Sequence, residues 1–258
     1  MIRLKTADEI EGIARAGRIV GETLAHVAER ARPGVSTAEL DREAEAFIRA
    51  HDGAVPAFKG LYDFPGTLCT SVNEEVVHGI PSARRELAEG DVLKVDVGVK
   101  LDGLFADAAL SVPIGPTAPD TERLLETTNR GLAAGIEAAR VGATIGDVGA
   151  AIQRIVEAEG FSIVRELVGH GLGHLPHEDP QVPNYGRPGS GPRIQEGLVI
   201  AIEPMVNLGS REIRTLDDGW TVVTADGSLS AHFEHTVAVT SEGPRILTGA
   251  RPRVTIQE

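Results

Sequence analysis

The chain has 258 residues, of which 41% are hydrophobic and only 3% aromatic, and its formal net charge is −13. That charge argues against sequence-independent nucleic-acid binding, which depends on Lys and Arg contacts to phosphate. No apolar run approaches the ~20 residues of a membrane span, and the first residues lack a signal-peptide pattern. A single cysteine excludes an internal disulfide and fits a reducing compartment. These features predict a cytoplasmic protein that binds neither nucleic acid nor membrane.

Two helices are predicted in the N-terminal part of the chain. The first runs from Thr6 to about residue 30, because Thr6 and Glu9 form a capping box and apolar residues follow with helical spacing. The second covers residues 37–51. Residues 54–87 are rich in Pro and Gly and are expected to be irregular, with room for strands between residues 68 and 77.

A β-hairpin is predicted next, from Val92 to Val112, with its turn at residues 101–103. The elements expected after it are, in order, helices at about 119–139 and 145–158, a strand at about 162–168, a Gly-, His- and Pro-rich stretch at 169–191, and strands near 198–206, 219–225 and 232–240. Helices that flank a largely antiparallel sheet in each half define the α+β class.

Two segments of the chain nearly repeat one another at an offset of 107 residues. Residues 89–99 and 196–206 share a Glu-Gly turn, an apolar run and one carboxylate at the same place, which is Asp96 in the first and Glu203 in the second. A charge in an apolar strand is costly unless it is paired. Two such acids related by duplication therefore suggest one shared central site that needs carboxylates.

The helices upstream carry the same duplication. Residues 31–40 match residues 139–148, and both contain a glycine near a helix end, then a Ser or Thr N-cap and an acid three residues later. We therefore expect one domain, residues 1–258, built from two pseudo-symmetric halves at roughly 1–112 and 113–258. Chance similarity between short amphipathic segments is the alternative.

The predicted hairpin brings two carboxylates together. Asp96 and Asp107 are 11 residues apart, and they are directly opposite or diagonal neighbours according to whether the loop is residues 101–102 or 102–103. In both registers they share a face, because strand side chains alternate. Two close carboxylates in apolar surroundings must be protonated or bind a cation. The apolar neighbours favour a divalent metal site over the alternative of two solvated acids on an exposed hairpin.

A second pair of carboxylates repeats this arrangement. Glu203 ends the apolar run 198–203, and Glu234 lies in the run 231–239. A strand–loop–strand return between the two runs would let these glutamates converge. A single acid in a strand is usually exposed to solvent, but four acids on four strands of a duplicated fold are much less often so.

The segment from Val168 to Pro180 is rich in histidine and glycine. His170 and His174 are four residues apart, but the glycines disfavour a helix and no Glu follows His170, so a zinc-binding helix is rejected. One imidazole with four carboxylates suits two ions of Mn, Fe, Co or Zn better than a structural zinc site. Two such ions ~3.5–4 Å apart can share a water molecule, lower its pKa and hold a scissile carbonyl.

These residues resemble those of a known family, the methionine aminopeptidases of the "pita-bread" metallopeptidase fold. The resemblance covers essentially the whole chain and is carried by five segments: residues 77–81, residues 169–171, residues 177–180, residues 202–207 and residues 233–236. It implies a curved, largely antiparallel sheet flanked by helices. It also implies a metal-dependent exopeptidase that removes the N-terminal methionine from nascent proteins and peptides when the second residue is small.

The resemblance further implies a role for each metal ligand. Five residues match, in order, the ligands of the family's dinuclear metal site: Asp96, Asp107, His170, Glu203 and Glu234. Asp96 would chelate one metal, Asp107 and Glu234 would bridge, and His170 and Glu203 would hold the other. The expected cofactor is two divalent ions per chain (Co, Mn, Fe or Zn), and Glu203 is also expected to carry a proton during catalysis.

Two histidines match positions in the family that are not metal ligands. His78 resembles the histidine that contacts the substrate peptide near its scissile bond. His177 resembles the histidine that hydrogen-bonds the substrate carbonyl and stabilises the oxyanion. Both are expected to bind substrate and to be catalytic, and His235 is a candidate for contact with the metal ligands.

The pocket for an unbranched thioether should be apolar, with soft or aromatic walls. By resemblance, four residues are expected near it: Tyr62, Phe64, Cys69 and Trp220. Leu61 and Pro176 stand where aromatic residues would be expected in close relatives, so the lining of this pocket departs from the family pattern.

Only 31 residues separate Glu203 from Glu234, too few for the helical insertion of type II enzymes, so the chain resembles a minimal type I enzyme. Its expected partners are nascent polypeptide N-termini, with a place at the ribosome left open, and it is expected to be a monomer. One alternative is an Xaa-Pro aminopeptidase or prolidase-like peptidase, whose usual N-terminal domain this sequence lacks. The other is a non-catalytic pita-bread binding protein, which need not keep all five ligands.

Overall fold

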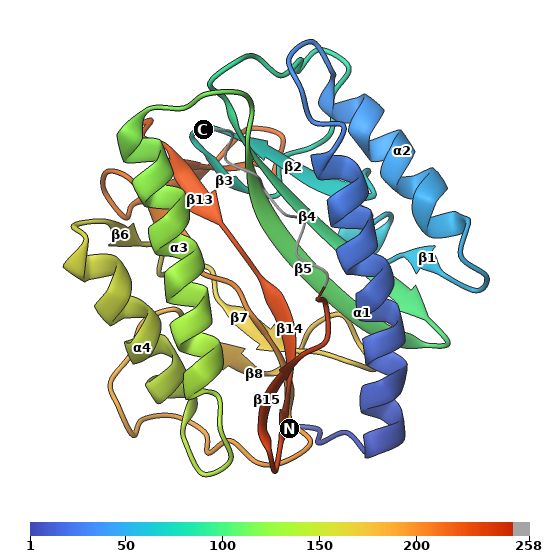
Figure 1. The fold of residues 1–258 in the computed structure, drawn as a ribbon, viewed down its shortest axis with the longest axis vertical. Helices are drawn as coiled ribbons and strands as arrows, with labels where there is room; N and C mark the ends of the chain where they lie inside the picture. Colours follow the sequence, from blue (N-terminus) through green and yellow to red (C-terminus); the bar gives the residue numbers. More distant parts are fainter. Residues whose placement is uncertain (250–258) are drawn as a thin grey trace.

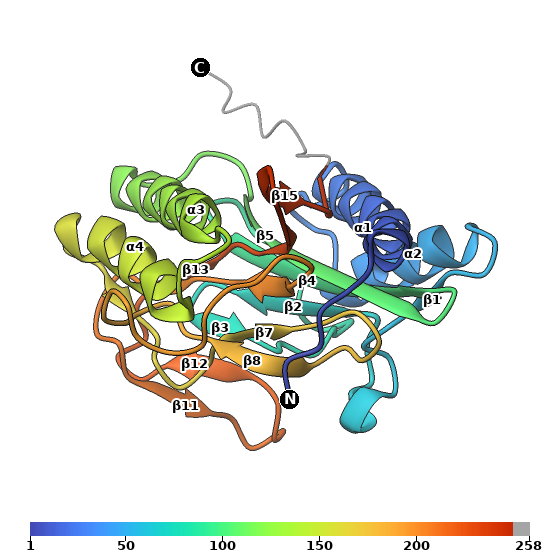
Figure 2. The ribbon, with the colours of Figure 1, turned by 90° about the horizontal axis from the view of Figure 1, so that it is seen from below.

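Two pairs of helices lie on opposite flanks of a set of strands that cross the middle of the molecule (Figures 1 and 2). A computed structural model describes residues 1–249 of the chain. The helices are α1 (Ala7–Ala28), α2 (Thr37–Arg49), α3 (Pro119–Ala138) and α4 (Ile145–Ala158). None of the helices in this described part is long and apolar enough to cross a membrane.

The helix starts follow from local chemistry. Thr6 and Thr144 each close a capping box with the acid three residues later, and the Ser36 side chain accepts from the N–H of Glu39. Helix α3 has no side-chain cap and begins instead with Pro119, whose missing N–H is no loss at that position. The four helices predicted from the sequence are confirmed, with ends that differ by one or two residues.

The strands form four antiparallel sheets. Those of the first half are β1 (Val55–Pro56), β2 (Leu68–Val72), β3 (Glu75–Val77), β4 (Val92–Leu101) and β5 (Leu104–Pro113). Those of the second half are β6 (Ser162–Ile163), β7 (Gly169–Gly171), β8 (Glu178–Val182), β9 (Val199–Ile202), β10 (Met205–Asn207), β11 (Ile213–Thr215), β12 (Val222–Thr224), β13 (Ser230–His232), β14 (His235–Thr240) and β15 (Gly243–Ile246).

The two larger sheets supply most of the site. One has the order β1-β4-β2 with β5 paired to β4, and the other has the order β15-β14-β9-β7-β8. The smaller sheets have the orders β13-β10-β6 and β11-β12-β3. The second of these joins the halves, because β3 of the first half pairs with β12 of the second. Pairing throughout the described residues is antiparallel, as the α+β prediction expected.

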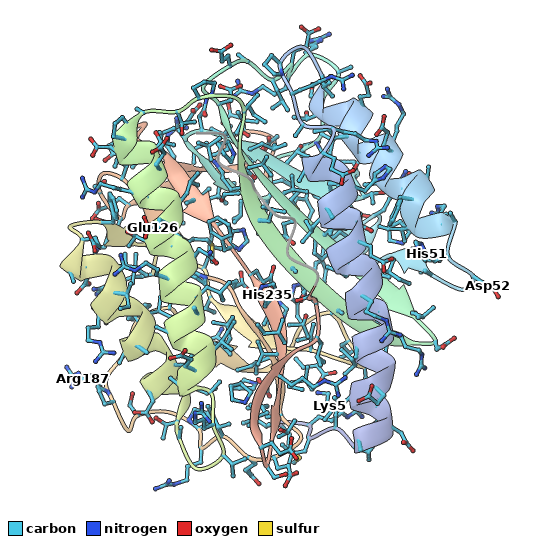
Figure 3. All side chains as sticks on the ribbon, viewed as in Figure 1. Lys5, His51, Asp52, Glu126, Arg187 and His235 are labelled. Atoms are coloured by element: carbon cyan, nitrogen blue, oxygen red, sulfur yellow. The ribbon has the colours of Figure 1, made fainter. Side chains whose placement is uncertain are left out.

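Each helix pair contributes to a large apolar cluster. One cluster contains residues of α1, α2, β4 and β5 together with Val199, Ala201 and Ala238 of β9 and β14, and the other contains residues of α3, α4, β9 and β14. Phe233 contacts both clusters. His235 lies centrally between the helix pairs, whereas His51, Asp52 and Arg187 lie at the periphery (Figure 3).

Four strand predictions were wrong in extent. The strand expected near 219–225 covers only Val222–Thr224. The strand expected at 162–168 ends at Ile163, because Leu167 and Val168 turn away from pairing and line a pocket. The strand expected near 198–206 is interrupted at Glu203 and Pro204, and the strand expected at 232–240 is interrupted at Phe233 and Glu234. Proline has no N–H to give to a ladder, which accounts for the first interruption.

Candidate metal centre and active site

The five predicted ligands come from five separate segments of the chain and converge on one place. Asp96 lies on β4, Asp107 on β5 and His170 on β7. Glu203 lies between β9 and β10, and Glu234 lies between β13 and β14. All five line the same cavity.

The hairpin register decides between the two arrangements left open by the sequence. Leu101 pairs with Leu104, so Asp102 and Gly103 form the turn, both with positive φ (51° and 83°) as a two-residue hairpin loop requires. Asp96 then faces Ala109, and Asp107 faces Gly98. The two aspartates are therefore diagonal neighbours on one face, and small residues stand opposite both.

The two glutamates lie across from each other in a shared interruption of the strands. Ile202 pairs with His235, and Met205 pairs with His232, so Glu203 and Glu234 both fall in the unpaired interval between them. The N–H of Glu234 donates to Ala109 O on β5 at 2.9 Å, which ties this interval to the aspartate hairpin. The convergence predicted for the second pair is thus present.

His170 faces the carboxylates with one nitrogen. Its Nε2 lies 3.5 Å from Glu203 Oε1 and 3.7 Å from Asp107 Oδ2. Its Nδ1 lies 3.0 Å from Gly171 O and donates there, which leaves Nε2 free to bind a metal. Ligand atoms of Asp107, His170 and Glu234 all lie within 4.8 Å of one another.

The carboxylates are buried and repel one another. Burial raises the pKa of Asp107 to about 6. Burial first, and the Asp107 carboxylate second, raise the pKa of Asp96 well above its ordinary value. Burial and the neighbouring acids likewise raise the pKa of Glu203 and of Glu234. Four acids held like this are stable only if protons or cations neutralise them.

The donor set fits divalent metal ions. Asp96 Oδ1 is buried without a hydrogen-bond partner, which is unusual for a buried oxygen. Four carboxylates and one imidazole form an oxygen-rich set of the kind that binds catalytic Mn, Fe, Co or Zn. A cation between these side chains would satisfy the orphaned oxygen and remove the repulsion in one step.

Thr236 on β14 holds Asp107 in place. Its hydroxyl donates to Asp107 O at 2.7 Å, lies 3.1 Å from Asp107 Oδ1, and accepts from the Asp107 N–H at 3.1 Å. These contacts hold the backbone and the side chain of one candidate ligand against the neighbouring strand. Such support fixes the geometry that a metal site requires.

The cluster forms the floor of a pocket of about 280 Å³. Its walls include the four residues expected by resemblance, namely Tyr62, Phe64, Cys69 and Trp220. Phe64 meets Trp220 edge to face with 5.1 Å between ring centroids. Leu61 also lines the pocket, whereas Pro176 is not among its lining residues.

His78 and His177 stand at the same pocket on different sides. His78 has a φ of 60°, a left-handed conformation that few residues other than glycine adopt, and its ring meets Trp220 at 6.4 Å between centroids. Tyr62 stacks on His177 at 6.1 Å between centroids. Burial lowers the pKa of both histidines, so both imidazoles are neutral near pH 7.

Several pocket residues were not predicted from the sequence. They are Phe58, Val77, Leu167, Val168 and Met205. The ring of Phe58 packs against Gly98, where an added Cβ would come within 2.7 Å of it. A glycine in a strand often marks such a close approach. Gly98 could therefore have indicated that a large side chain, here Phe58, packs against β4.

The Nδ1 of His235 lies 2.9 Å from Thr248 Oγ1. The buried imidazole of His232 also lies next to the candidate ligands, with its Nε2 4.0 Å from Glu203 Oε2. Burial lowers the pKa of His232 to about 3. A neutral imidazole therefore lies beside the carboxylates, at a position that no sequence pattern singles out.

Comparison with known proteins places the chain in a family. A model of metallopeptidase family M24 matches residues 11–241. A methionine aminopeptidase from Clostridium perfringens is 54% identical over 248 residues, which cover 96% of this chain and 99% of that protein. The crystal structure of methionine aminopeptidase from Thermotoga maritima has a TM-score of 0.95 at 42% identity, and the match covers 97% of this chain and 100% of that one.

A more distant likeness shows the fold alone. A prolidase from Pyrococcus furiosus has a TM-score of 0.78 at 22% identity, and the match covers 96% of this chain and 66% of that one. The fold and the converging acids define a metallopeptidase of the pita-bread class. The chain belongs to metallopeptidase family M24 and, within it, to the methionine aminopeptidases, as the resemblance in the sequence predicted.

Proposed function

We propose that this metal-dependent exopeptidase removes the N-terminal methionine from peptides and newly made proteins when the second residue is small. The observation that carries this function is the position of the acidic cluster, which floors a pocket with apolar walls. A narrow apolar pocket with aromatic and thiol walls suits one unbranched thioether side chain. A scissile bond just beyond that side chain would then lie over the acids.

Two divalent ions are the proposed cofactor. Asp96 would hold one ion, Asp107 and Glu234 would bridge, and His170 and Glu203 would hold the other. The close grouping of Asp107, His170 and Glu234 supports these assignments. When bound, such ions activate a water molecule and polarise the scissile carbonyl. Co, Mn, Fe and Zn all suit this donor set.

The protein side chains supply orientation and protons. His177 is neutral and can donate an N–H to the oxyanion that develops on the carbonyl oxygen. His78, on the wall shared with Trp220, is proposed to contact the peptide beside the scissile bond. Glu203, whose pKa is raised by burial and by its acidic neighbours, can accept a proton and pass it to the leaving amine.

We further propose that residues 1–258 are one catalytic domain derived by duplication. Gly34 and Gly142 both have left-handed φ values, and their N–H groups donate to Leu87 O and Ile194 O respectively. The N-caps that follow form matching isolated bridges, Ser36 with Glu86 and Thr144 with Arg193. The same local structure at nearly the same offset supports halves at roughly 1–112 and 113–258.

We also propose a cellular context for this enzyme. A single, buried cysteine and a strongly acidic composition support a cytoplasmic enzyme. We propose that it acts as a monomer on the N-termini of nascent polypeptides, which emerge at the ribosome.

Peptide cleavage tests the function. Metal-supplied enzyme should release Met from Met-Ala-Ser, and it should leave Met-Lys-Ser, Leu-Ala-Ser and Ala-Pro-Ala largely intact. Efficient removal of Leu from Leu-Ala-Ser would contradict the methionine pocket. Cleavage of Ala-Pro-Ala instead would indicate a proline-specific peptidase of the same fold. No cleavage with any of Co, Mn, Fe or Zn would indicate a binding protein.

A further inference from the structure

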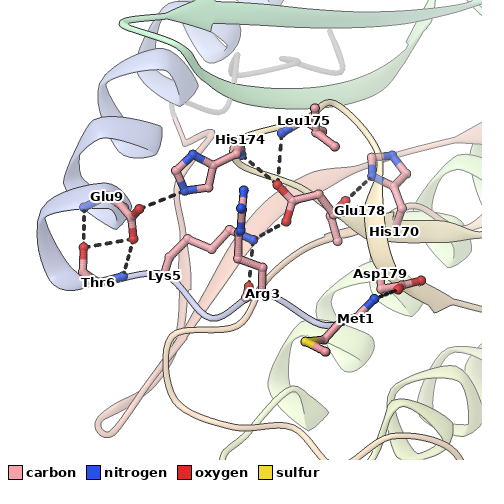
Figure 4. Close-up of polar contacts among 11 residues, drawn as sticks. Met1, Arg3, Lys5, Thr6, Glu9, His170, His174, Leu175, Glu178 and Asp179 are labelled. Carbon is pink, nitrogen blue, oxygen red and sulfur yellow. Dashed lines mark hydrogen bonds and ion pairs between the residues drawn. The ribbon is translucent and has the colours of Figure 1, made fainter.

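A buried ion pair joins the segment before α1 to the segment that carries His177. Lys5 Nζ lies 2.6 Å from Glu178 Oε2, and the exposed fractions of the two side chains are 0% and 7% (Figure 4). The Lys5 backbone N–H donates to Gly197 O at 2.7 Å, and Lys5 Nζ also donates to Arg3 O at 2.9 Å. Lys5 is therefore fixed by its main chain as well as by its side chain.

Gly173 makes room for this lysine. A Cβ at position 173 would lie 2.6 Å from Lys5 Cε and 3.1 Å from a methyl group of Ile13. The Lys5 stem thus runs directly against the backbone of the loop that starts at Gly173. A shift of the Lys5 side chain would therefore require a shift of the loop backbone, and the reverse.

The other oxygen of Glu178 organises the loop itself. Glu178 Oε1 accepts the N–H of His174 at 2.8 Å and the N–H of Leu175 at 3.0 Å. The Glu178 carboxylate thereby closes a hydrogen-bonded loop over residues 174–178, and His177 is one of the residues of that loop. Burial alone would raise the pKa of Glu178, but the Lys5 and N–H hydrogen bonds outweigh it and hold that pKa below its ordinary value.

The start of this loop is also held from β5, where the N–H of Phe105 donates to Gly173 O at 2.8 Å. The Leu175 side chain is 58% exposed. A second tie runs from His174 Nε2 to Glu9 Oε1 at 2.8 Å, but both of these side chains are about one third exposed. The Lys5–Glu178 contact is therefore more deeply buried than the His174–Glu9 contact, and Glu178 directly follows His177 in the sequence.

We infer that Lys5 and Glu178 are positioning residues for His177, so that the segment preceding α1 sets where the oxyanion donor stands. This inference rests on the role proposed above for His177. Neither residue lines the pocket, so both act through the loop and not on the substrate. Displacement of a catalytic group by ~1 Å can cost ~10²-fold in rate, so a loosened loop should lower turnover with little effect on substrate binding.

Two single variants and a matched control test the inference. Lys5→Met keeps the stem against Gly173 and removes the charge, and Glu178→Gln keeps one acceptor and turns an amide toward Lys5. Each should lower kcat on Met-Ala-Ser by ~10–10²-fold, keep KM within about 2-fold and retain both metals. Glu11→Gln breaks the ion pair from α1 to Arg245 on β15, away from the loop, and should keep wild-type kcat.

A double-variant cycle separates positioning from a general loss of structure. In a His177→Ala background, Lys5→Met and Glu178→Gln should cause almost no further loss of kcat, because the group that they position is gone. A full multiplicative loss in that background overturns the inference. So does loss of a metal, or wild-type kcat, in either single variant.

Two further controls distinguish a failure to fold from a loss of function. Should a single variant unfold because it leaves one charge buried, Lys5→Met with Glu178→Met removes both charges and should fold while losing kcat to the same extent. The His177 imidazole NMR signals, assigned with His177→Ala, should shift in the Lys5 and Glu178 variants and not in Glu11→Gln. Unchanged signals overturn the inference. If the wild-type enzyme is inactive on Met-Ala-Ser but the His177 signals still shift in the variants, the proposed function is wrong and the inference that Lys5 and Glu178 position His177 stands.

Discussion

The imidazole of His177 lies edge-on against that of His170, with 4.5 Å between ring centroids and 77° between ring planes. The two rings are neighbours with different surroundings. His170 directs Nε2 at the carboxylates of Asp107 and Glu203, whereas His177 lies between His170 and Tyr62. The two imidazoles therefore have different neighbours, which are carboxylates for His170 and the Tyr62 ring for His177.

This difference predicts separate effects of three alanine variants. His177→Ala should keep both metals and lose about 10²–10³-fold in kcat, the usual effect of removing one oxyanion donor. His170→Ala should weaken occupancy of one metal, because it deletes a proposed ligand. His78→Ala should keep its metals and lose kcat/KM. Metal counting beside steady-state kinetics measures all three, and metal loss in His177→Ala but not His170→Ala would reverse the assigned roles.

Thr236 should matter for metal affinity although it binds no metal. Thr236→Val keeps the shape of the side chain and removes the hydroxyl that holds Asp107. Loss of such support typically costs about 10–100-fold in metal affinity. Competition with a chelator would measure it. Ser111→Ala, which removes a similar hydroxyl link from β5 to His232 O, is the matched control and should leave metal affinity much closer to wild type.

The helices and the acidic residues could be predicted because their signals are local. Capping boxes at Thr6 and Thr144 fix helix starts, and an acid inside an apolar run is conspicuous wherever the fold places it. The sequence allowed two registers for the hairpin, and the observed turn at Asp102 and Gly103 decides between them. In either register the alternation of strand side chains places Asp96 and Asp107 on the same face.

The break at Glu234 and the long-range ties could not be predicted from local patterns. Glu234 looked like a strand residue, because its apolar neighbours continue the run, yet it lies in a break opposite Glu203. Lys5 and Glu178 are 173 residues apart and carry no periodic signal that relates them. Phe58 enters the pocket from an irregular segment, where composition indicates neither direction nor depth.

Phe64 should set the fit of the methionine side chain. It is 4% exposed and packs edge-on against Trp220 on the pocket wall. Phe64→Ala should raise KM for Met-Ala-Ser far more than it lowers kcat, and should destabilise the protein by about 3–5 kcal/mol through the cavity it leaves. Phe161→Ala, a buried phenylalanine outside this pocket, should destabilise similarly without raising KM. Equal KM effects in both variants would contradict a role of Phe64 in substrate fit.

Removal of the metals should make stability fall as pH rises. In the metal-free protein the pKa of Asp107 is raised to about 6 by burial, and those of Asp96, Glu203 and Glu234 are raised as well. Unfolded carboxyls titrate near pH 4. A group whose pKa is higher in the folded state stabilises the fold fully below its unfolded pKa, and this stabilisation is lost as pH rises through its folded pKa.

The loss for Asp107 alone is on the order of 3 kcal/mol between pH 4 and pH 7, and the coupled acids should add to it. Chelated protein should therefore melt at a lower temperature at pH 8 than at pH 5, whereas metal-loaded protein should not, because bound cations take the place of the protons. Thermal melting of both forms across this range measures the effect. Asp96→Asn removes one repelling acid and should flatten the slope of the metal-free protein. A melting temperature that rises with pH after complete chelation would show that the four carboxylates do not repel one another as their burial implies.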